Sequence, residues 1–278
     1  MKRFLKILSV PIVLGGVAAL VWLETKRPLR RSRESKLTRS GRNLAVAGLA
    51  ALALRLTEKP VATRLAGLVE EKNLGLLKIV RLPQWLEIVL AVVLMDYTLY
   101  LWHVLTHKAP FLWRFHLVHH VDLDLDASTA VRFHFGELVI SVIWRAAQIL
   151  VIGVAPHSLK AWQMFLFPSI LFHHSNLRLP ESLDKRLQRF IVTPRLHGIH
   201  HSIVRAETDS NWSSGLTVWD RLHGTFRNDV SPEEIIIGVP AFQDRDEVVL
   251  TEIMPLPFEN QKNDWQLPDG DLPSKPFK

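Results

Sequence analysis

The chain has 278 residues, of which 48% are hydrophobic, with a net charge of +7 and a mean hydropathy of +0.12. These values fit a membrane protein with several spans better than a nucleic-acid-binding protein, because the lysines and arginines cluster beside apolar segments. The lack of cysteine excludes disulfides, thiolate zinc sites, iron–sulfur clusters and cysteine nucleophiles.

Residues 5–23 form the first apolar run, which is about long enough to cross a hydrocarbon core of ~30 Å as a helix. Lys2 and Arg3 before it also occur in signal peptides, but no clear small-residue cleavage site follows, which favours an uncleaved span. Residues 24–43 hold eight lysines and arginines against two glutamates. The positive-inside rule therefore predicts that this basic segment is cytoplasmic.

Residues 44–56 are apolar but short, so they form either a marginal second span or an interfacial helix, and residues 57–84 form a polar connector. Residues 85–102 are apolar again and lead directly to His103 and His107. Asp96 lies two helical turns before His103. We expect it either to orient that imidazole or to face the interior of a helix bundle.

Residues 138–154 and 159–172 are two further apolar segments, joined by a short turn that contains Pro156. This pattern predicts a helical hairpin that enters the membrane and returns. The return would bring His173 and His174 to the same side as His103 and His107.

The chain is polar after residue 176. We expect an amphipathic helix at residues 183–190, a helix start at Thr193 and Pro194, and a packed surface loop at residues 211–226. Three regions follow: N-terminal membrane segments (1–84), a catalytic domain (85–227) and a C-terminal polar tail (228–278). The predicted fold is an all-α, polytopic membrane helical bundle with a cytoplasmic histidine-rich helical cap.

Histidines recur at spacings that suit metal binding. Residues four apart on a helix share one face, and the pattern H-x-x-H-H occurs both at residues 116–120 and at residues 197–201. Eight or more clustered imidazoles exceed what one ion can hold, so two ions are implied. The histidines in these clusters are His103, His107, His116, His119, His120, His173, His174, His197, His200 and His201.

The residues inside these histidine boxes limit the chemistry. Hydrolases of the H-E-x-x-H kind carry a glutamate within the box as general base, whereas residues 104–106, 117–118 and 198–199 include no carboxylate. A nitrogen-rich site with two redox metals suits oxygen activation and attack on a C–H bond instead. The aspartates at 122, 124 and 126 do not form a calcium loop, because the required glycine and terminal acidic residue are missing.

A set of motifs within residues 85–227 resembles the fatty acid hydroxylase / sterol desaturase superfamily. The motifs are D-Y-x-x-x-x-x-H-x-x-x-H (96–107), L-W-R-F-H-x-V-H-H (112–120), R-F-H-x-x-E (132–137), H-S-N-x-R-L-P (174–180), T-P-x-x-H-x-x-H-H (193–201) and W-D-R-L-x-G-T (219–225). The resemblance implies integral-membrane, non-haem di-iron oxygenases with cytoplasm-facing histidine boxes that act on lipids.

The resemblance also implies roles for individual residues. Asp126 and Glu137 are candidates for an acidic residue that shapes hydrogen bonds around the metals, and Asn176 completes the candidate catalytic set. His157 and His223 are expected to be structural. The implied ligands are His103, His107, His116, His119, His120, His174, His197, His200 and His201, with His173 and His134 as further candidates.

The function expected from these observations is a membrane-bound oxidoreductase. It would use two iron ions and O2 to hydroxylate or desaturate a fatty acyl, sterol-like or ether lipid. Because no flavin, haem or nucleotide fingerprint is present, electrons must come from a ferredoxin, cytochrome or reductase partner, or from a pterin. Two alternatives stay open: a zinc-dependent membrane hydrolase, and a non-catalytic lipid- or metal-binding membrane protein.

Overall fold

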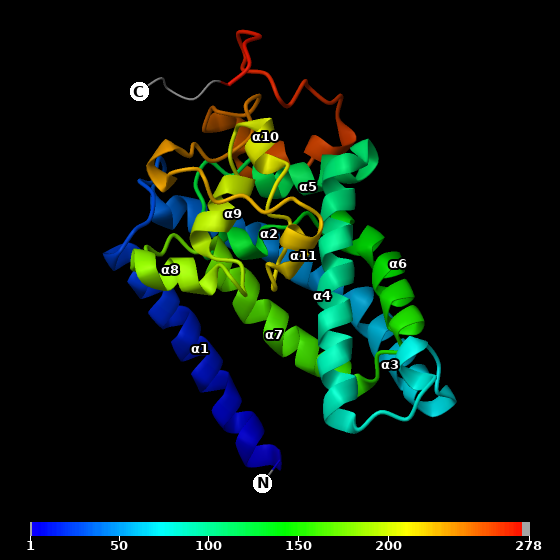
Figure 1. Ribbon diagram of the computed structural model, residues 1–278. Helices are drawn as coiled ribbons and strands as arrows, with labels where there is room; N and C mark the ends of the chain where they lie inside the picture. The colour runs from blue at the N-terminus through cyan, green and yellow to red at the C-terminus, as the bar shows by residue number, and fades with distance from the viewer. Residues whose placement is uncertain (1, 274–278) are drawn as a thin grey trace.

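The computed structural model describes residues 2–273, and the side chains of residues 14–273, as helices joined by loops, with β-structure limited to isolated bridges (Figure 1). The predicted all-α class is confirmed for this part of the chain. The α-helices are α1 (Lys2–Lys26), α2 (Lys36–Leu56), α3 (Glu58–Lys72), α4 (Gln84–Lys108), α5 (Pro110–His120), α6 (Phe135–Ile152), α7 (Pro156–His174), α8 (Glu181–Leu187), α9 (Pro194–His200), α10 (Arg205–Thr208), α11 (Val218–Leu222) and α12 (Leu250–Ile253). Short 3-10 helices are η1 (Leu76–Lys78), η2 (Thr129–Val131), η3 (Pro232–Glu234), η4 (Asp246–Val248) and η5 (Leu256–Phe258).

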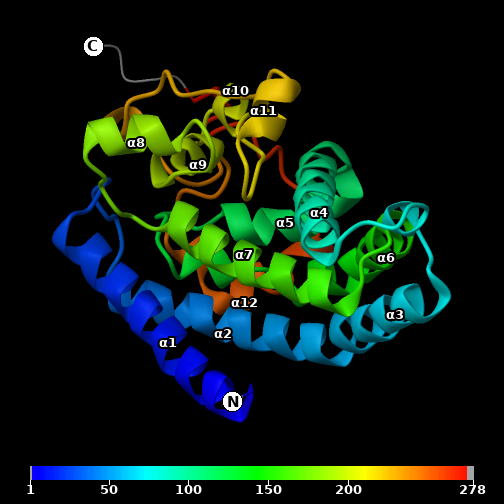
Figure 2. The same cartoon turned by 60° about the horizontal axis from the view of Figure 1, so that its bottom comes forward.

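Among the described residues, α4 and α6 are the helices long and apolar enough to cross a membrane. They contain the apolar segments expected at residues 85–102 and 138–154. The span expected at residues 5–23 belongs to α1, whose side chains before residue 14 lie outside the described residues. The segment at residues 44–56 is the later part of α2, which packs on α6 and is followed end to end by α3 (Figure 2).

The fourth and fifth apolar segments form the consecutive helices α6 and α7, joined by a short turn. α6 packs mainly against α3 and α2, whereas α7 packs mainly against α4, and of the two only α6 is long and apolar enough to cross a membrane. Gly153 ends α6 with a φ of 84°, a left-handed conformation that favours glycine. A Cβ atom at Gly153 would lie 2.7 Å from the carbonyl oxygen of Leu74, so the turn before α7 packs directly on the turn after α3. This close contact fixes where α7 starts, and therefore where its last turn carries His174.

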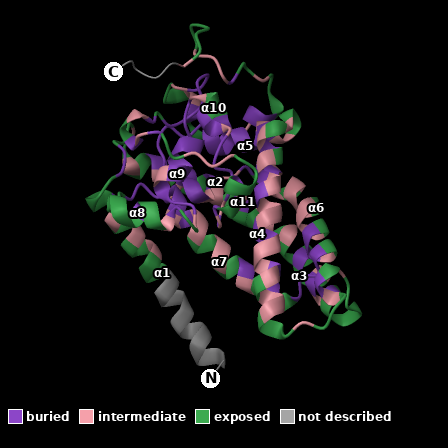
Figure 3. Cartoon of the chain, in the orientation of Figure 1, coloured by how far each residue is buried: buried purple, intermediate pink, exposed green. Residues whose placement is uncertain are grey.

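The C-terminal region differs from the expected polar tail. Phe242, Val248 and Ile253 are buried and belong to one hydrophobic cluster with Leu117 and Val118 of α5. Figure 3 shows how closely the buried residues gather in this cap above the long helices. The apolar residues of this region occur singly or in runs of up to three between prolines and charges, so no helical or strand period marked them as core.

The N-terminal basic segment is packed onto the cap. Residues 27–30, which we call the N-terminal strap, pair with residues 176–178: Leu29 N–H donates to the Asn176 carbonyl (2.8 Å), and Arg178 N–H donates to the Arg27 carbonyl (2.7 Å). The side chain of Asn176 accepts from the Arg30 N–H and donates to the Arg30 carbonyl, both at 2.9 Å. The strap thus holds the chain immediately after α7.

Candidate metal centre

Nine buried or half-buried histidines form two groups inside the cap, and within each group one nitrogen from every ring lies within 4.8 Å of the others. The first is the five-histidine group, which comprises His103, His107, His116, His120 and His200. The second is the four-histidine group, which comprises His119, His174, His197 and His201. All nine were predicted as ligands, and the two groups correspond to the two ions expected from the number of histidines.

Four helices supply these rings. His103 and His107 share one face of the last turns of α4, and His174 lies at the end of α7. The box on α5 divides between the groups, since His116 and His120 are four residues apart while the intervening His119 faces the other group. The box on α9 divides in the same way, because His200 joins the first group and His197 joins the second.

The four-histidine group has the geometry of a cation site. The Nε2 atom of His174 lies 3.1 Å from that of His119 and 3.0 Å from that of His197, and the Nε2 atoms of His197 and His201 are 3.1 Å apart. Two nitrogens at right angles around an ion, each about 2.1 Å away, would be separated by ~3.0 Å. The spacing therefore fits a shared metal ion.

The hydrogen bonds of the Nδ1 atoms, which face away from the centre, show which ring nitrogen carries the proton. His119 Nδ1 is 3.2 Å from the Arg132 carbonyl, and His174 Nδ1 is 2.8 Å from the Ile170 carbonyl. A carbonyl only accepts, so each Nδ1 carries the proton and each Nε2 presents a lone pair to the centre. Lone pairs that face each other at this distance repel unless a cation lies between them, so the donor set fits a metal.

The five-histidine group is oriented similarly. His103 Nδ1 donates to the Trp212 carbonyl (2.7 Å), and His200 Nδ1 donates to the Ser210 carbonyl (2.9 Å). His116 Nδ1 donates to Glu137 Oε1 at 3.1 Å. The Nε2 atoms of His116, His120 and His200 are buried without a hydrogen-bond partner, as expected for lone pairs reserved for an ion.

Burial keeps these rings neutral, which is the form that binds a metal. Burial lowers the pKa of His200 to about 3, and hydrogen bonds from its ring oppose the shift only in part. Burial also lowers the pKa values of His119, His120 and His201 well below the usual range, and the neighbouring imidazoles lower them further. These four rings therefore take up no proton in this fold near neutral pH.

Two further candidate ligands lie outside both groups. The His173 ring is buried beside those of His174 and His197, with ring centroids 4.6 and 4.2 Å away. His134 caps α6, where its Nδ1 accepts from the Gly136 N–H (3.0 Å) and its Nε2 donates to the Met254 carbonyl (3.2 Å). Both nitrogens of His134 are thereby used within the protein.

The three candidate catalytic residues have different surroundings. Glu137 contacts the metal centre through His116, as its expected role requires. The side chain of Asn176 is hydrogen-bonded to the N-terminal strap. Asp126 accepts hydrogen bonds from the N–H and the hydroxyl of Ser128 and forms an ion pair with Arg39. Asp96 does not contact an imidazole; it accepts from the Leu216 N–H and the Trp219 indole.

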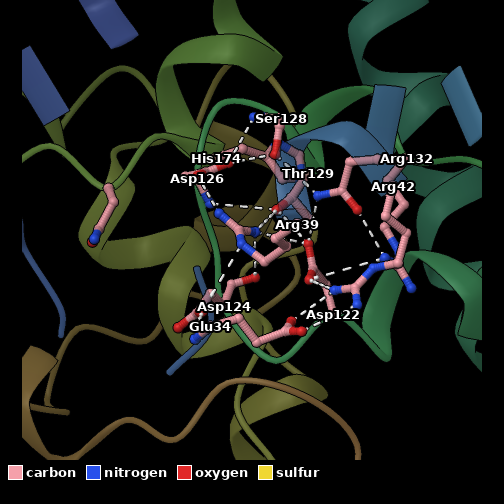
Figure 4. A network of polar contacts seen from close by, with 12 residues as sticks. Glu34, Arg39, Arg42, Asp122, Asp124, Asp126, Ser128, Thr129, Arg132 and His174 are labelled. Atoms are coloured by element: carbon pink, nitrogen blue, oxygen red, sulfur yellow. Dashed lines mark hydrogen bonds and ion pairs between the residues drawn. The ribbon is translucent and has the colours of Figure 1, made fainter. Parts of the chain in front are cut away.

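The loop at residues 122–126 forms a buried ionic network with α2 (Figure 4). Arg39 donates to Asp122 (2.9 Å) and pairs with Asp126, and Arg42 lies 3.3 Å from Asp122. Asn43 links this network to Arg132, whose Nη1 donates to the Asn43 amide oxygen at 2.8 Å. Arg132 is also the residue whose backbone carbonyl orients His119. The network therefore connects α2 to the metal centre through Asn43 and Arg132.

Sequence reasoning gave no role to the basic residues of this network. Arg42 and Asn43 lie three and four residues after Arg39, so all three face the same side of the helix, opposite the three aspartates of the loop. The opposite charges of these two segments can be seen in the sequence. However, a dense basic block beside an apolar run is more often a solvent-exposed segment next to a membrane span.

Comparisons with known proteins agree with this geometry. The family model described as fatty acid hydroxylase matches residues 88–225. Ornithine lipid hydroxylase OlsE of Rhizobium tropici is 34% identical over 162 residues, 56% of this chain and 46% of its own length. Cholesterol 25-hydroxylase of Mus musculus is 25% identical over 151 residues (54% and 49%), and alkylglycerol monooxygenase of Homo sapiens is 24% identical over 149 residues (52% and 31%). The matches thus span about half or less of each relative's length, and no solved structure matches the chain.

Proposed function

Because residues 88–225 belong to the fatty acid hydroxylase family, we propose that this protein is a membrane-bound non-haem di-iron oxidoreductase that uses O2 to hydroxylate or desaturate a lipid C–H bond. The observation that carries the proposal is the pair of buried histidine groups with inward-facing lone pairs. The relatives named above act on ornithine lipids, cholesterol and alkylglycerols, which supports a lipid as the substrate class.

The nine histidines of the two groups would hold the ions, and the bound irons would supply the redox chemistry with O2. The surrounding residues would hold five of the nine rings in place: the carbonyls of Arg132, Ile170, Trp212 and Ser210 and the carboxylate of Glu137 fix the proton on the outer nitrogens of these five. Burial of the rings would exclude water from the reacting atoms.

A cytoplasmic orientation in a multi-pass protein is part of the proposal. The basic segment at residues 24–43 contacts the metal cap through the strap and through the Arg39 network. The segment and the metal centre therefore lie on one side of any membrane crossed by α4 and α6, and the positive-inside rule makes that side cytoplasmic.

A zinc-dependent hydrolase is supported less well. Both groups consist of imidazoles, and Glu137, the carboxylate on His116, is occupied in orienting that ring. A general base for water would need a carboxylate that faces the reacting atoms instead.

The test is lipid analysis of cells with and without the gene, grown under 18-oxygen gas. A lipid carrying a labelled hydroxyl, or a new double bond, should appear only with the gene, and His119→Ala and His200→Ala should abolish it. His157→Ala is the matched control, because His157 lies outside both groups and is largely exposed. A purified protein that contains only zinc and turns over without O2 would contradict the proposal.

A further inference from the structure

The proposed oxygenase needs electrons from outside the chain, and the next step rests on that function. We propose that Trp265 and Trp113 form the route by which electrons enter the five-histidine group. We further propose that the surface around Trp265 docks a one-electron carrier protein with an acidic surface.

The route is a continuous series of ring contacts. The rings of Trp265 and Trp113 are stacked, with centroids 5.6 Å apart and an interplanar angle of 23°. The Trp113 ring in turn lies 4.9 Å from His107 and 5.4 Å from His120, both in the five-histidine group. Electron tunnelling falls steeply with the gap between π-systems, so adjacent rings give it a short path.

The two tryptophans are held rigidly. Trp113 is buried on α5, and its indole N–H donates to Asp264 Oδ2 at 2.8 Å. The Asp264 carbonyl accepts from the Ala241 N–H at 3.2 Å, which ties the loop before Trp265 to the cap. Fixed geometry favours electron transfer, because little reorganisation accompanies each event.

Trp265 is the outer end of the route. It is half-buried and belongs to the C-terminal segment. This segment, drawn in red, lies at the end of the molecule opposite the lower ends of α4 and α6 (Figure 1). A carrier in the aqueous phase could thus reach Trp265 while these helices stay in a membrane.

Two exposed cations belong to the segments at this entry point, which also carry the carboxylates of Asp264, Asp269 and Asp271. The Arg205 guanidinium lies 5.6 Å from the Trp265 ring centroid and its side chain is 66% exposed. Lys262, three residues before Trp265, is 52% exposed. Arg205 is 3.9 Å from Asp209, and Lys262 pairs with Glu247, so carboxylates of the carrier would compete with these partners. Complementary charge of this kind steers a partner to its site.

Hydroxylation of one lipid C–H bond requires two electrons to pass along this route. Each reduced carrier loses one electron and becomes oxidised, and one ferric ion becomes ferrous. Two such transfers, with two protons, one O2 and one lipid C–H bond, give one lipid hydroxyl and one water. The tryptophans conduct the electrons and are unchanged afterwards.

The kinetic test uses the full-length, iron-loaded protein in detergent and reduced [2Fe–2S] ferredoxin as the probe, without O2. We expect Trp265→Leu to slow ferredoxin oxidation by about tenfold or more, equivalent to ~1.4 kcal/mol of barrier. Trp265→Phe keeps an aromatic ring and should lose less. Phe258→Leu is the matched control, because Phe258 is an exposed aromatic residue of the same segment that contacts Phe115 and His134 instead.

Two further measurements separate the route from general damage. Iron content and reduction by dithionite with methyl viologen should match wild type in all three variants, because a small mediator needs no docking surface. Arg205→Glu should weaken binding of ferredoxin to the metal-free protein at low salt, which is measurable by calorimetry without any turnover.

The outcomes distinguish this inference from the proposed function. If Trp265→Leu and Arg205→Glu both match wild type while the wild-type protein still incorporates labelled oxygen, the entry route is wrong and the oxygenase stands. If the iron-loaded wild type oxidises ferredoxin no faster than the metal-free protein and labels no lipid, the proposed function itself fails.

Discussion

The Nε2 atoms of His119 and His174 lie 3.1 Å apart, although the rings come from α5 and α7 and each uses its Nδ1 to donate to a backbone carbonyl. Neither Nε2 can donate a proton to the other. A cation is the simplest group that makes this pair stable.

His174→Ala should therefore reduce the metal content from two ions to one per chain, because only the four-histidine group loses a ligand. Metal analysis of the purified, folded variant measures this directly. His157→Ala should keep both ions, since this exposed ring lies 3.8 Å from Glu70 and outside the groups. Two ions retained in the His174 variant would show that the four rings do not share one.

Glu137→Ala should weaken metal binding at the five-histidine group by about 10- to 100-fold, because His116 loses the carboxylate that orients it. Glu137→Gln keeps an oxygen acceptor but no charge, so its loss should be smaller. Competition with a chelator measures the affinities. Equal affinities for wild type and the alanine variant would exclude a positioning role for Glu137.

Acidification should destabilise the metal-free protein. His200 has a pKa of about 3 in the fold and an ordinary value near 6.5 when unfolded, so between these values the unfolded chain binds the extra proton. Stability is full above pH ~6.5 and falls as the pH drops toward the folded value, by about 2 kcal/mol at pH ~5 from this residue alone. Thermal unfolding at a series of pH values tests the sign. A Tm that rises on acidification across this range would contradict it.

Arg39→Met should destabilise the fold by about 3–5 kcal/mol, because the buried Asp126 would lose the cation it pairs with and Asp122 would keep only Arg42 and Arg132. Arg31→Met changes an exposed arginine of the same basic segment and should have little effect. Denaturant unfolding compares the two. Adding Asp122→Asn to the Arg39 variant should recover part of the loss, whereas no recovery would mean that the network is not the cause.

Helical spacing alone predicted that His103 clusters with His107 and His116 with His120. The two apolar runs on either side of a proline turn also predicted the consecutive helices α6 and α7. What the sequence did not reveal was the division of each H-x-x-H-H box between the two histidine groups. That depends on the angles at which α5 and α9 approach each other.

The carbonyls that orient the rings were beyond sequence reasoning for a different reason. Every residue has a carbonyl, so nothing distinguishes Trp212 or Ser210 until the fold brings its backbone to a histidine. Asp96 shows the opposite error: its spacing suggested a contact with His103, but its carboxylate is satisfied by the loop at residues 216–219. The C-terminal region was misjudged because its buried residues follow no period.

The N-terminal strap has a consequence for how small this protein can be made. Residues 88–225 carry all nine clustered histidines, yet the loop after α5 and the chain after α7 are neutralised or clamped by residues 27–43. Truncation to the region shared with relatives would expose three carboxylates and release the segment beyond His174. The smallest piece able to form both histidine groups therefore begins well upstream of the shared region, and transplanting the histidine boxes alone would not transplant the site.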